Sequence, residues 1–337
     1  NFLFIVYFNK EGRFLHSCFY RFFNEDLIGF FRDLGVETKV ERGGRVFPAS
    51  DYAHSVVNAM KIFLFKSRVK IIFNKRVKEL LTKGSKVIGV KTFDLDYYYS
   101  NSVIVATGGL SYPYTGSTGD GYEMLARVGH KIIKPLPSLV GIEVKESHAK
   151  DLQGLSLRNI KASLIVNGRL IKSIFGEMIF THFGLSGPII LSLSRDVVKF
   201  IDSREKDVVI SLNLKPALDR ETLENRLLRD IENFGRKCYK NLLKNLLPNK
   251  LIPVFIRLSK IEGDKKTNQI TQAQRKLIYG LLTDFRFTVR GARHIEEAIV
   301  TQGGVDTSEV NPKTMESKLI KGLYIAGELL DVDALTG

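Results

Sequence analysis

The sequence predicts an α/β fold in which a parallel-sheet domain is interrupted by a long insertion. Two short apolar segments, 102–106 and 322–326, have the composition of parallel strands that are buried on both faces. Each runs into a glycine turn, Thr107-Gly108-Gly109 in the first case and Gly327-Glu328 in the second. Because this pattern occurs in the first third of the chain and again at its end, one interrupted domain explains it better than three consecutive domains.

Length and composition indicate an ordinary globular protein of two or three folded units. The chain has 337 residues, of which 44% are hydrophobic and 26% are charged. No apolar run comes near the roughly 20 residues that a membrane-spanning helix needs. The two cysteines, Cys18 and Cys238, lack metal-ligand spacing. We therefore expect no metal site and no disulfide scaffold, and we expect a reducing, cytoplasmic location.

The chain is strongly basic, with 51 basic and 36 acidic residues and a formal net charge of +15. A nucleic-acid surface would explain this charge, and so would a compositional bias toward Lys, Asn, Ile and Phe. The segment 220–260 holds 10 basic and 4 acidic residues. Since it carries neither an RNA-binding aromatic motif nor a compact Lys/Arg block, we favour compositional bias and do not expect nucleic acid as a partner.

Helices are expected at two places in the first 65 residues. Asn24 is a good helix cap, and the run 27–34 has an apolar helical face. Gly35 follows that run and is expected to end the helix. A loop at 43–48 separates this helix from a second one at 51–65. We expect Ser50 to cap that second helix.

Strands follow at 69–73 and 87–92, and a helix at 121–128 that Gly129 closes. Pro135 and Pro137 mark a boundary, after which short strands with turns fill the segment up to residue 214.

The pattern then changes twice more along the chain. It becomes helical over 216–258 and returns to strand over 288–301.

Four motifs lie in a fixed order along nearly the whole chain. They are Gly44-Arg45-Val46-Phe47-Pro48, residues 106–121 (Ala-Thr-Gly-Gly-Leu-Ser-Tyr-Pro-Tyr-Thr-Gly-Ser-Thr-Gly-Asp-Gly), residues 180–188 (Phe-Thr-His-Phe-Gly-Leu-Ser-Gly-Pro) and residues 327–333 (Gly-Glu-Leu-Leu-Asp-Val-Asp). The second motif resembles the two-dinucleotide-binding flavoproteins, fumarate-reductase-type enzymes among them. The four together resemble the aminoacetone-oxidase-like family of FAD-binding oxidoreductases, which includes bile-acid-pathway flavin reductases.

The resemblance implies a Rossmann-like FAD-binding domain with a large insertion made of a β-barrel-like module and a helical module. The FAD-binding domain would be discontinuous, formed by residues 1–137 and 295–337. The β-rich module would occupy residues 138–215 and the mainly helical module residues 216–294.

This sequence departs from the family at its two ends. The family opens with a strand and a Gly-x-Gly-x-x-Gly turn, and continues with a Gly-Tyr-Asn stretch after the position of Gly337. Neither is present in the sequence. We therefore expect a fragment that is truncated at both ends, lacks the pyrophosphate cradle and holds little FAD by itself.

For the intact protein the resemblance implies an FAD-dependent oxidoreductase. FAD would move two electrons between NAD(P)H, or a small reduced substrate, and an acceptor. Two other interpretations stay open: a flavoprotein associated with RNA through the basic segment 220–260, and an inactive truncated remnant. The sequence specifies neither the substrate, nor the acceptor, nor the oligomeric state.

The resemblance also assigns cofactor-binding residues. Thr107, Gly108 and Gly109 would lie against FAD at a strand end, although a plain strand-to-loop turn would have the same sequence. Val77 would offer backbone groups to the adenine, or else pack in the core.

At the second turn Gly327, Glu328 and Asp331 would approach the flavin. In related flavoproteins an acid there lies near the ribityl chain. A carboxylate that caps the next helix is the alternative, and the two roles are compatible.

Arg45 and His182 are the candidates for catalysis. Arginine can hold a carboxylate with two hydrogen bonds, and histidine can move a proton near neutral pH. The alternatives are a surface charge for Arg45 and a turn-holding role for His182.

Overall fold

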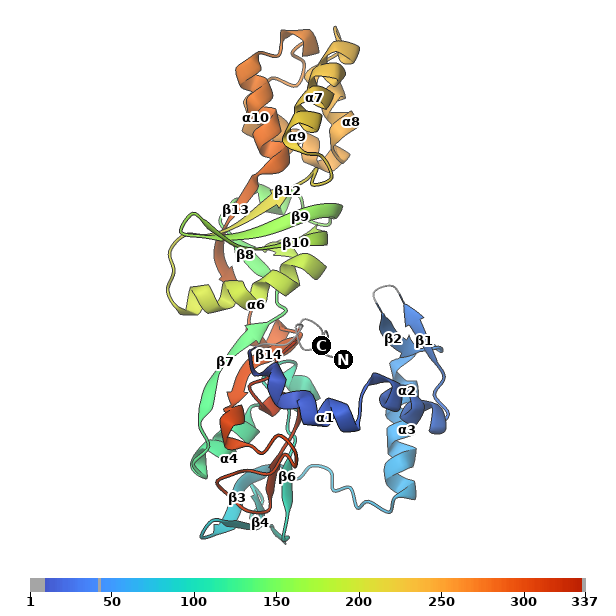
Figure 1. Cartoon of the computed structure of the whole chain (residues 1–337), viewed down its shortest axis with the longest axis vertical. Coiled ribbons are helices and arrows are strands. Elements are labelled where there is room, and N and C mark those ends of the chain that lie inside the picture. Colours follow the sequence, from blue (N-terminus) through green and yellow to red (C-terminus); the bar gives the residue numbers. More distant parts are fainter. Residues whose placement is uncertain (1–9, 42–43, 335–337) are drawn as a thin grey trace. The chain divides into compact units, whose positions relative to one another are not determined.

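The computed structural model describes residues 10–41 and 44–334, which form two compact units (Figure 1). The first unit comprises Asn1–Gly108, Gly119–Ile133 and Gly303–Val332. The second comprises Gly109–Thr118, Lys134–Gln302 and Asp333–Gly337. Both units are therefore discontinuous in sequence.

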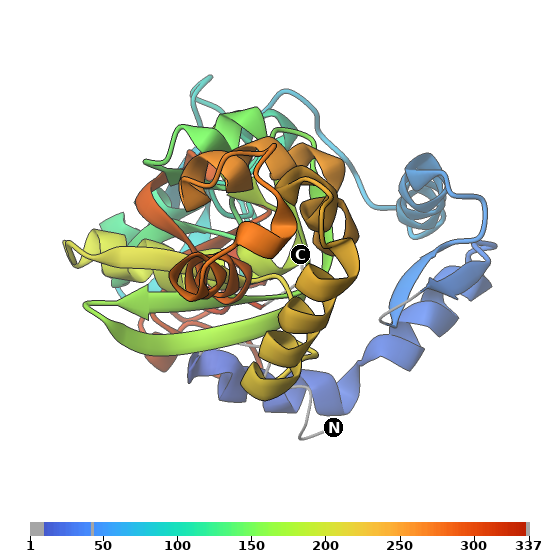
Figure 2. The same cartoon turned by 90° about the horizontal axis from the view of Figure 1, so that it is seen from above.

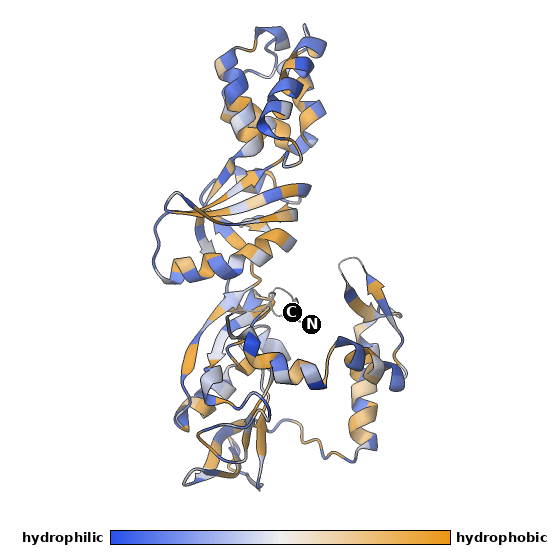
Figure 3. Ribbon diagram, in the orientation of Figure 1, coloured by the Kyte–Doolittle hydropathy of each residue, from blue (hydrophilic) through white to orange (hydrophobic). Residues whose placement is uncertain are grey.

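The second unit is built on a closed barrel of six antiparallel strands. Their order around the barrel is β10-β11-β8-β13-β12-β9. Buried and exposed residues alternate along most of the long strand β9, and Figure 3 shows the matching alternation of apolar and polar residues. The barrel confirms the predicted β-barrel-like module. Its strands are β8 (Ile142–Val144), β9 (Ser156–Val166), β10 (Arg169–Phe180), β11 (Gly184–Ser186), β12 (Val208–Asn213) and β13 (Phe285–Ala292).

The helix α6 (Pro188–Asp202) interrupts the segment in which the sequence analysis expects only strands. Gly187 and Pro188 begin it, as proline suits the first helical turn. Its buried residues Ile190, Leu193 and Val197 follow at helical spacing. The prediction was wrong here because the apolar and β-branched residues of this segment also suit a strand. A short helix, α5 (His148–Asp151), precedes β9.

Four longer helices follow β12 and form one group, with α10 seen end-on in Figure 2. The first three agree with the helical prediction for 216–258, whereas α10 lies beyond that segment. Phe255 of α9 packs against Phe285 of β13 with ring centroids 5.6 Å apart, so the helices share one hydrophobic core with the barrel. The helices are α7 (Arg220–Phe234), α8 (Tyr239–Leu246), α9 (Ile252–Ser259) and α10 (Gln272–Thr283), with the short 3-10 helices η4 (Asn249–Leu251) and η5 (Thr267–Gln269).

Two strands far apart in sequence pair in the first unit. β6 (Val103–Val105) and β15 (Leu323–Ile325) are parallel, as the repeated strand–glycine pattern predicts. The helix α4 spans Asp120–Arg127, one residue earlier at each end than the predicted helix 121–128. Gly129 lies beyond its end, with a φ of +98°. The same unit contains the antiparallel sheet β3 (Val77–Lys83), β4 (Lys86–Thr92) and β5 (Tyr97–Tyr99).

Two further strands, β7 (Ile132–Ser138) and β14 (Val300–Val305), pair with each other, and each contains a boundary between the units. The predicted strand at 288–301 is thus two strands, β13 and β14, with a 3-10 helix between them. The remaining 3-10 helices are η2 (Lys10–Leu15), η3 (Pro113–Thr115), η6 (Ile295–Glu297), η7 (Thr307–Glu309) and η8 (Gly327–Leu329).

The start of the first unit contains α1 (His16–Arg21), α2 (Asn24–Asp33), β1 (Thr38–Glu41), β2 (Arg45–Pro48) and α3 (Ala53–Lys66). Gly35 follows α2 with a φ of +82°, as predicted. The predicted cap Asn24 is instead the first residue of α2, and Phe23 occupies the cap position.

Three other predictions for this region were wrong. Residues 45–48 are a strand rather than part of a loop, because β2 pairs with β1 in a hairpin; Gly43 lies outside the described residues. Ser50 does not cap α3, because its hydroxyl bonds to Ser55 and to the backbone of Tyr52. The segment 69–73 forms no strand, since it has no pairing partner and its apolar side chains are largely exposed.

None of the helices in the described part of the chain combines the length and apolar character that crossing a bilayer requires.

Candidate functional site

The two glycine turns leave neighbouring strands at the same edge of the first unit. In the register of β6 and β15, Val103 pairs with Leu323 and Val105 with Ile325. The backbone N–H of Ala326 donates to the Val105 carbonyl at 3.1 Å, one residue before the Gly327 turn. In open parallel sheets, ligands bind beyond the carboxyl ends of the strands. The structure therefore brings Thr107 and Gly108 together with Gly327.

The first turn of α4 packs directly against both turns. A Cβ added to Gly121 would lie 2.2 Å from Thr107 Oγ1 and 2.7 Å from Leu329 Cδ2. Such distances do not occur between real side chains, so this position requires glycine. The Gly-Asp-Gly pattern at 119–121 signals a glycine-rich helix start, but the sequence does not identify Thr107 and Leu329 as its contacts.

The two turns contain a buried polar group and backbone space that a ligand could use. The Thr107 hydroxyl is buried and has no hydrogen-bond partner among the described residues. Gly108 and Gly327 have φ angles of +74° and +80°, and a Cβ at Gly327 would point into open space. A buried hydroxyl without a partner is costly unless a ligand or water satisfies it. These residues fit the close backbone approach that a dinucleotide makes.

Carboxylates surround the second turn. The Tyr122 hydroxyl donates to the backbone carbonyl of Glu328 at 3.2 Å. Burial, together with the nearby carboxylates of Glu328 and Asp331, raises the pKa of Tyr122 well above its usual range. Tyr122 therefore stays a neutral hydrogen-bond donor that fixes the turn, and the turn carries negative charge.

The carboxyl end of β14 joins the same site, which the sequence analysis missed. The backbone N–H of Asp331 donates to the Val305 carbonyl at 3.0 Å. A Cβ on Gly304 would lie 2.4 Å from the carbonyl oxygen of Leu329, so this strand passes unusually close to the turn. The pair Gly303-Gly304 inside the buried strand β14 was the signal for this close approach.

Val77, the predicted adenine-side residue, is half-buried at the start of β3. Its neighbour Arg76 makes two hydrogen bonds, 2.6 and 2.7 Å long, to the carboxylate of Asp120. Asp120 is the first residue of α4, so this ion pair ties the start of β3 to the helix that packs on Thr107.

Gly109 lies just across the unit boundary, at the start of a loop that belongs to the second unit. The Thr301 hydroxyl accepts from the backbone N–H of Leu110 at 2.8 Å and lies 3.1 Å from the Ser111 hydroxyl. Gly109 therefore begins a loop that is fixed on β14.

A buried polar cluster lies in the second unit and was not predicted. The Arg195 guanidinium is 2.9 Å from the Asp333 carboxylate, and the Ser138 hydroxyl donates to the same carboxylate. Gln302 donates to the Pro137 carbonyl at 2.9 Å. Arg195 and Asp333 are 138 positions apart, and no local pattern marks them as partners.

The two predicted catalytic residues lie in different units. Arg45 is exposed on β2 in the first unit, and no hydrogen bond or ion pair of the described residues links it to either turn. His182 is exposed in the second unit, with its ring edge-on to Phe183. The turn around His182 is held by Thr181 rather than by the imidazole. The Thr181 N–H donates to the Gly184 carbonyl, and the Gly184 N–H donates to the hydroxyl and the carbonyl of Thr181.

These features define a Rossmann-type α/β protein with a glycine-lined site at the ends of parallel strands. A family model described as HI0933-like protein Rossmann domain matches residues 3–337, which is nearly the whole chain. The chain belongs to the HI0933-like family, within the superfamily of FAD-dependent oxidoreductases.

Three curated relatives cover 98% of this chain. The 3-dehydro-bile acid delta(4,6)-reductase of Clostridium scindens is 28% identical, and 80% of its length is matched. The ribosomal RNA dihydrouridine synthase of Haemophilus influenzae is 29% identical and that of Escherichia coli 28%, each with 79% of its length matched. These two names count against the expectation that nucleic acid is no partner.

Solved structures with a similar arrangement include an E. coli quinol fumarate reductase chain, with 16% identity and a TM-score of 0.39. Mycobacterium smegmatis Sdh1 follows with 13% identity and a TM-score of 0.36. They match 95% and 91% of this chain, which spans about half the length of either protein (51% and 49%).

Proposed function

We propose that this protein is an FAD-dependent oxidoreductase whose cofactor binds at the two glycine turns. The observation that carries the proposal is the parallel pairing of β6 and β15, which sets Thr107-Gly108 beside Gly327-Glu328. When bound there, FAD supplies two-electron transfer.

The residues of the site have distinct proposed roles. The Thr107 hydroxyl donates a hydrogen bond to the cofactor, which would satisfy its buried oxygen. The backbone at Gly108, Gly109 and Gly327 lets the cofactor approach closely, and Val77 presents backbone groups to the adenine. Glu328 and Asp331 accept hydrogen bonds from cofactor hydroxyl groups.

The reaction we propose is the reduction of a carbon–carbon double bond that is conjugated to a carbonyl. One relative is named as a bile acid reductase and two as synthases of dihydrouridine, which is uridine with one double bond saturated. Two electrons and one hydrogen reach one carbon as hydride, and a proton reaches the other. The electrons come from NAD(P)H or a small reduced substrate.

Arg45 and His182 remain the proposed substrate-facing residues. Arg45 would bind a carboxylate or phosphate of the substrate, and His182 would supply the proton. Both side chains are exposed, so both are accessible to a ligand. We also propose a cytoplasmic location, which the two unbonded cysteines support.

The test is an FAD titration of the purified protein, followed by flavin absorbance near 450 nm (an approximate property of the cofactor). Thr107→Val removes the hydroxyl and should weaken FAD binding by about three- to tenfold, as the loss of one neutral hydrogen bond implies. Thr82→Val is the matched control, because Thr82 is exposed on β3. Equal FAD affinities for the wild type and Thr107→Val would contradict the proposal.

RNA is a second candidate for the acceptor. The net charge of +15 and the two relatives named as ribosomal RNA dihydrouridine synthases favour it. The basic segment 220–260 forms α7, α8 and α9, which carry most of its charge on exposed side chains. Contacts from such side chains to phosphates would give binding that falls steeply with salt.

This candidate is tested by ribosomal RNA binding over a range of salt concentrations and by assay of dihydrouridine after incubation with FAD and NADPH. Dihydrouridine formation together with steep salt dependence supports RNA. Reduction of a small unsaturated ketone, with no RNA affinity at low salt, supports a small-molecule acceptor.

A further inference from the structure

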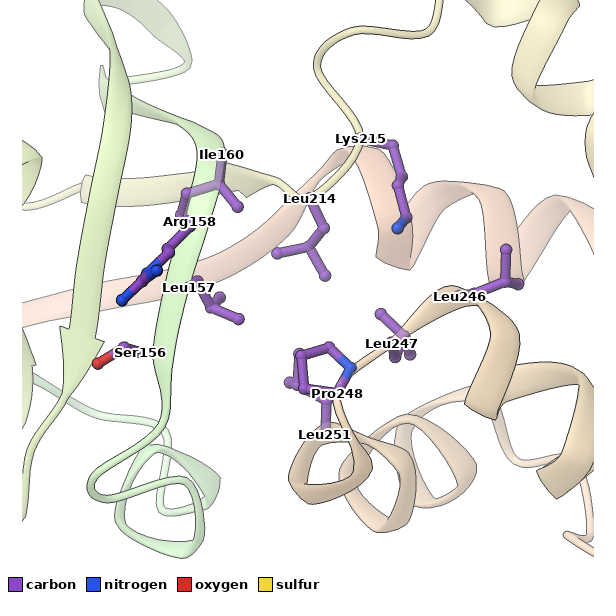
Figure 4. A pocket seen from close by; sticks show the side chains of 10 residues that line it. All are labelled: Ser156, Leu157, Arg158, Ile160, Leu214, Lys215, Leu246, Leu247, Pro248 and Leu251. Atoms are coloured by element: carbon purple, nitrogen blue, oxygen red, sulfur yellow. The ribbon is translucent and has the colours of Figure 1, made fainter.

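A cavity of about 360 Å³ lies within the second unit, between the barrel and the helices. Its walls come from three places: the start of β9, the connection between β12 and α7, and the corner between α8 and η4 (Figure 4). This volume is at the lower end of the range for small-molecule sites. None of the residues assigned to the glycine-turn site lines it.

The inner wall of the cavity is apolar. Leu157 of β9, Leu247 after α8 and Leu251 of η4 line it, and their side chains are 5%, 7% and 0% exposed. Leu214, from the β12–α7 connection, faces the same space. Such a wall favours an apolar body, because transfer of hydrocarbon groups from water to an apolar surface is favourable.

The charged groups of the cavity are both cationic. Arg158 and Lys215 line it, and no acidic side chain does. Neither cation has an ion-pair or hydrogen-bond partner for its side chain among the described residues. In Figure 4 the Lys215 ammonium points toward the leucines of the α8–η4 corner, whereas the Arg158 guanidinium lies on the opposite side near Ser156.

Lys215 is the half-buried member of this pair. Burial and the positive charge of Arg226 lower the pKa of Lys215, so its ammonium group is held in an unfavourable environment. Arg158 is exposed and lies at the rim. A half-buried ammonium group without a counter-charge is costly to the protein alone, and an anionic ligand would compensate it.

We propose that this cavity binds a small amphipathic anion, with a carboxylate at Lys215 and an unbranched or cyclic hydrocarbon body on the leucines. A medium-chain carboxylate has this chemistry. The charge-assisted hydrogen bond from Lys215 fixes the head group, and Arg158 adds attraction at the rim. Because β9 and the α8–η4 corner both contact the ligand, its binding also ties the barrel to the helices.

Decanoate is the probe, titrated into the whole protein by isothermal calorimetry. Lys215→Met keeps the length of the side chain and removes its charge, and it should weaken decanoate binding by about tenfold or more. Arg158→Met should weaken it less, because an exposed charge is screened by water. Lys244→Met is the matched control, since Lys244 is an exposed residue of α8 that does not line the cavity.

The neutral analogue 1-decanol separates the charge from the apolar contacts. It should bind the wild type more weakly than decanoate does, and Lys215→Met should not weaken it further. Thermal unfolding of each variant shows that it is folded; Lys215→Met should be at least as stable as the wild type. The proposal is overturned if the wild type does not bind decanoate, or if Lys215→Met and Lys244→Met bind it equally well.

Discussion

The two units bury their apolar side chains to very different extents. In the second unit Phe180, Phe255 and Phe287 are essentially inaccessible within a core that is continuous from the barrel to the helices. In the first unit Ile104, at the centre of β6, is 69% exposed, and Phe65 of α3 is 83% exposed. Around the candidate cofactor site the same unit buries Val105, Leu323 and Leu329, so its apolar burial is concentrated at that site.

This difference in burial indicates which interactions stabilise each unit. Apolar burial specifies the second unit, because every barrel strand contributes to one core. The first unit combines buried apolar side chains at the ends of β6 and β15 with close glycine packing at Gly121 and Gly304 and with polar contacts such as Arg76–Asp120. Functional sites commonly occupy the less stable parts of a protein, where ligand binding completes the structure.

The largest expected effect tests the core of the second unit. Phe287→Ala should lower the free energy of unfolding by about 3–5 kcal/mol, because it opens a cavity among Phe180, Phe285 and His148. The same change at exposed Phe65 should stay within about 0.5 kcal/mol. Urea unfolding followed by circular dichroism measures both. Comparable losses at the two positions would remove the distinction between the units.

Substitution of Glu328 should have the next largest effect, and this effect is on FAD binding rather than on stability. Its carboxylate follows the Gly327 turn, and a hydrogen bond to a charged group contributes roughly 1.5–3 kcal/mol. Glu328→Ala should therefore weaken FAD binding by about 10- to 100-fold, and Glu328→Gln, which keeps an acceptor, should weaken it less. Flavin-fluorescence titration measures this.

A matched control for Glu328 is Glu123→Ala, since Glu123 is an exposed α4 residue whose side chain pairs with Arg127. If Glu328 only caps a helix, the pattern reverses. Glu328→Ala would then lower the stability of the FAD-free protein by about 1 kcal/mol and leave the titration unchanged.

Local patterns predicted the parts of the fold that depend on local chemistry. The strand–glycine pattern at Thr107 and Gly327 indicated two strand ends at one sheet edge, and β6 and β15 do pair there. Gly35 and Gly129 marked the ends of α2 and α4, because both adopt positive φ angles. The barrel was predicted through a resemblance rather than from strand patterns alone.

Contacts between distant segments could not be predicted in this way. The pairing of Arg195 with Asp333 depends on how α6 and the end of the chain fold. Asp333 ends the motif 327–333, but no local pattern links it to Arg195. The apolar run 69–73 has strand composition, yet no strand is placed to pair with it. For Arg45 and His182 the sequence supplies a residue type suited to catalysis, but only tertiary contacts could assign a role.

The substitution His148→Leu in the second unit should have a smaller effect than the preceding ones, and it should increase stability. His148 stacks on Phe285 with ring centroids 5.6 Å apart, while its Nε2 atom is buried without a partner among the described residues. His148→Leu removes that unsatisfied atom and keeps an apolar contact, so it should raise the free energy of unfolding by about 1 kcal/mol at pH 7. Thermal unfolding checks this. A loss of stability would show that the imidazole contributes more than its buried nitrogen costs.

The smallest expected effect concerns how the unfolding free energy of the first unit depends on pH. His130 is 3% exposed, and its ring nitrogens lie 3.0 Å from Glu309 and 2.8 Å from Ser317. Burial lowers the pKa of His130, and the opposing effect of the Glu309 carboxylate is weaker. The unfolded chain therefore binds the proton more readily than the folded protein does. The stability that neutral His130 provides is complete above its ordinary pKa of about 6.5 and is lost as the pH falls below that value.

His130→Gln should reduce the loss of unfolding free energy between about pH 8 and pH 5, because glutamine does not titrate in this range. The variant is best compared in the His148→Leu background, since burial also lowers the pKa of His148 and would give the second unit a similar acid sensitivity. His54→Gln is the control in the first unit, because His54 is exposed on α3. Its pH profile should match that of the background. If His130→Gln leaves the profile unchanged as well, the acid sensitivity of the first unit comes from groups other than this buried imidazole.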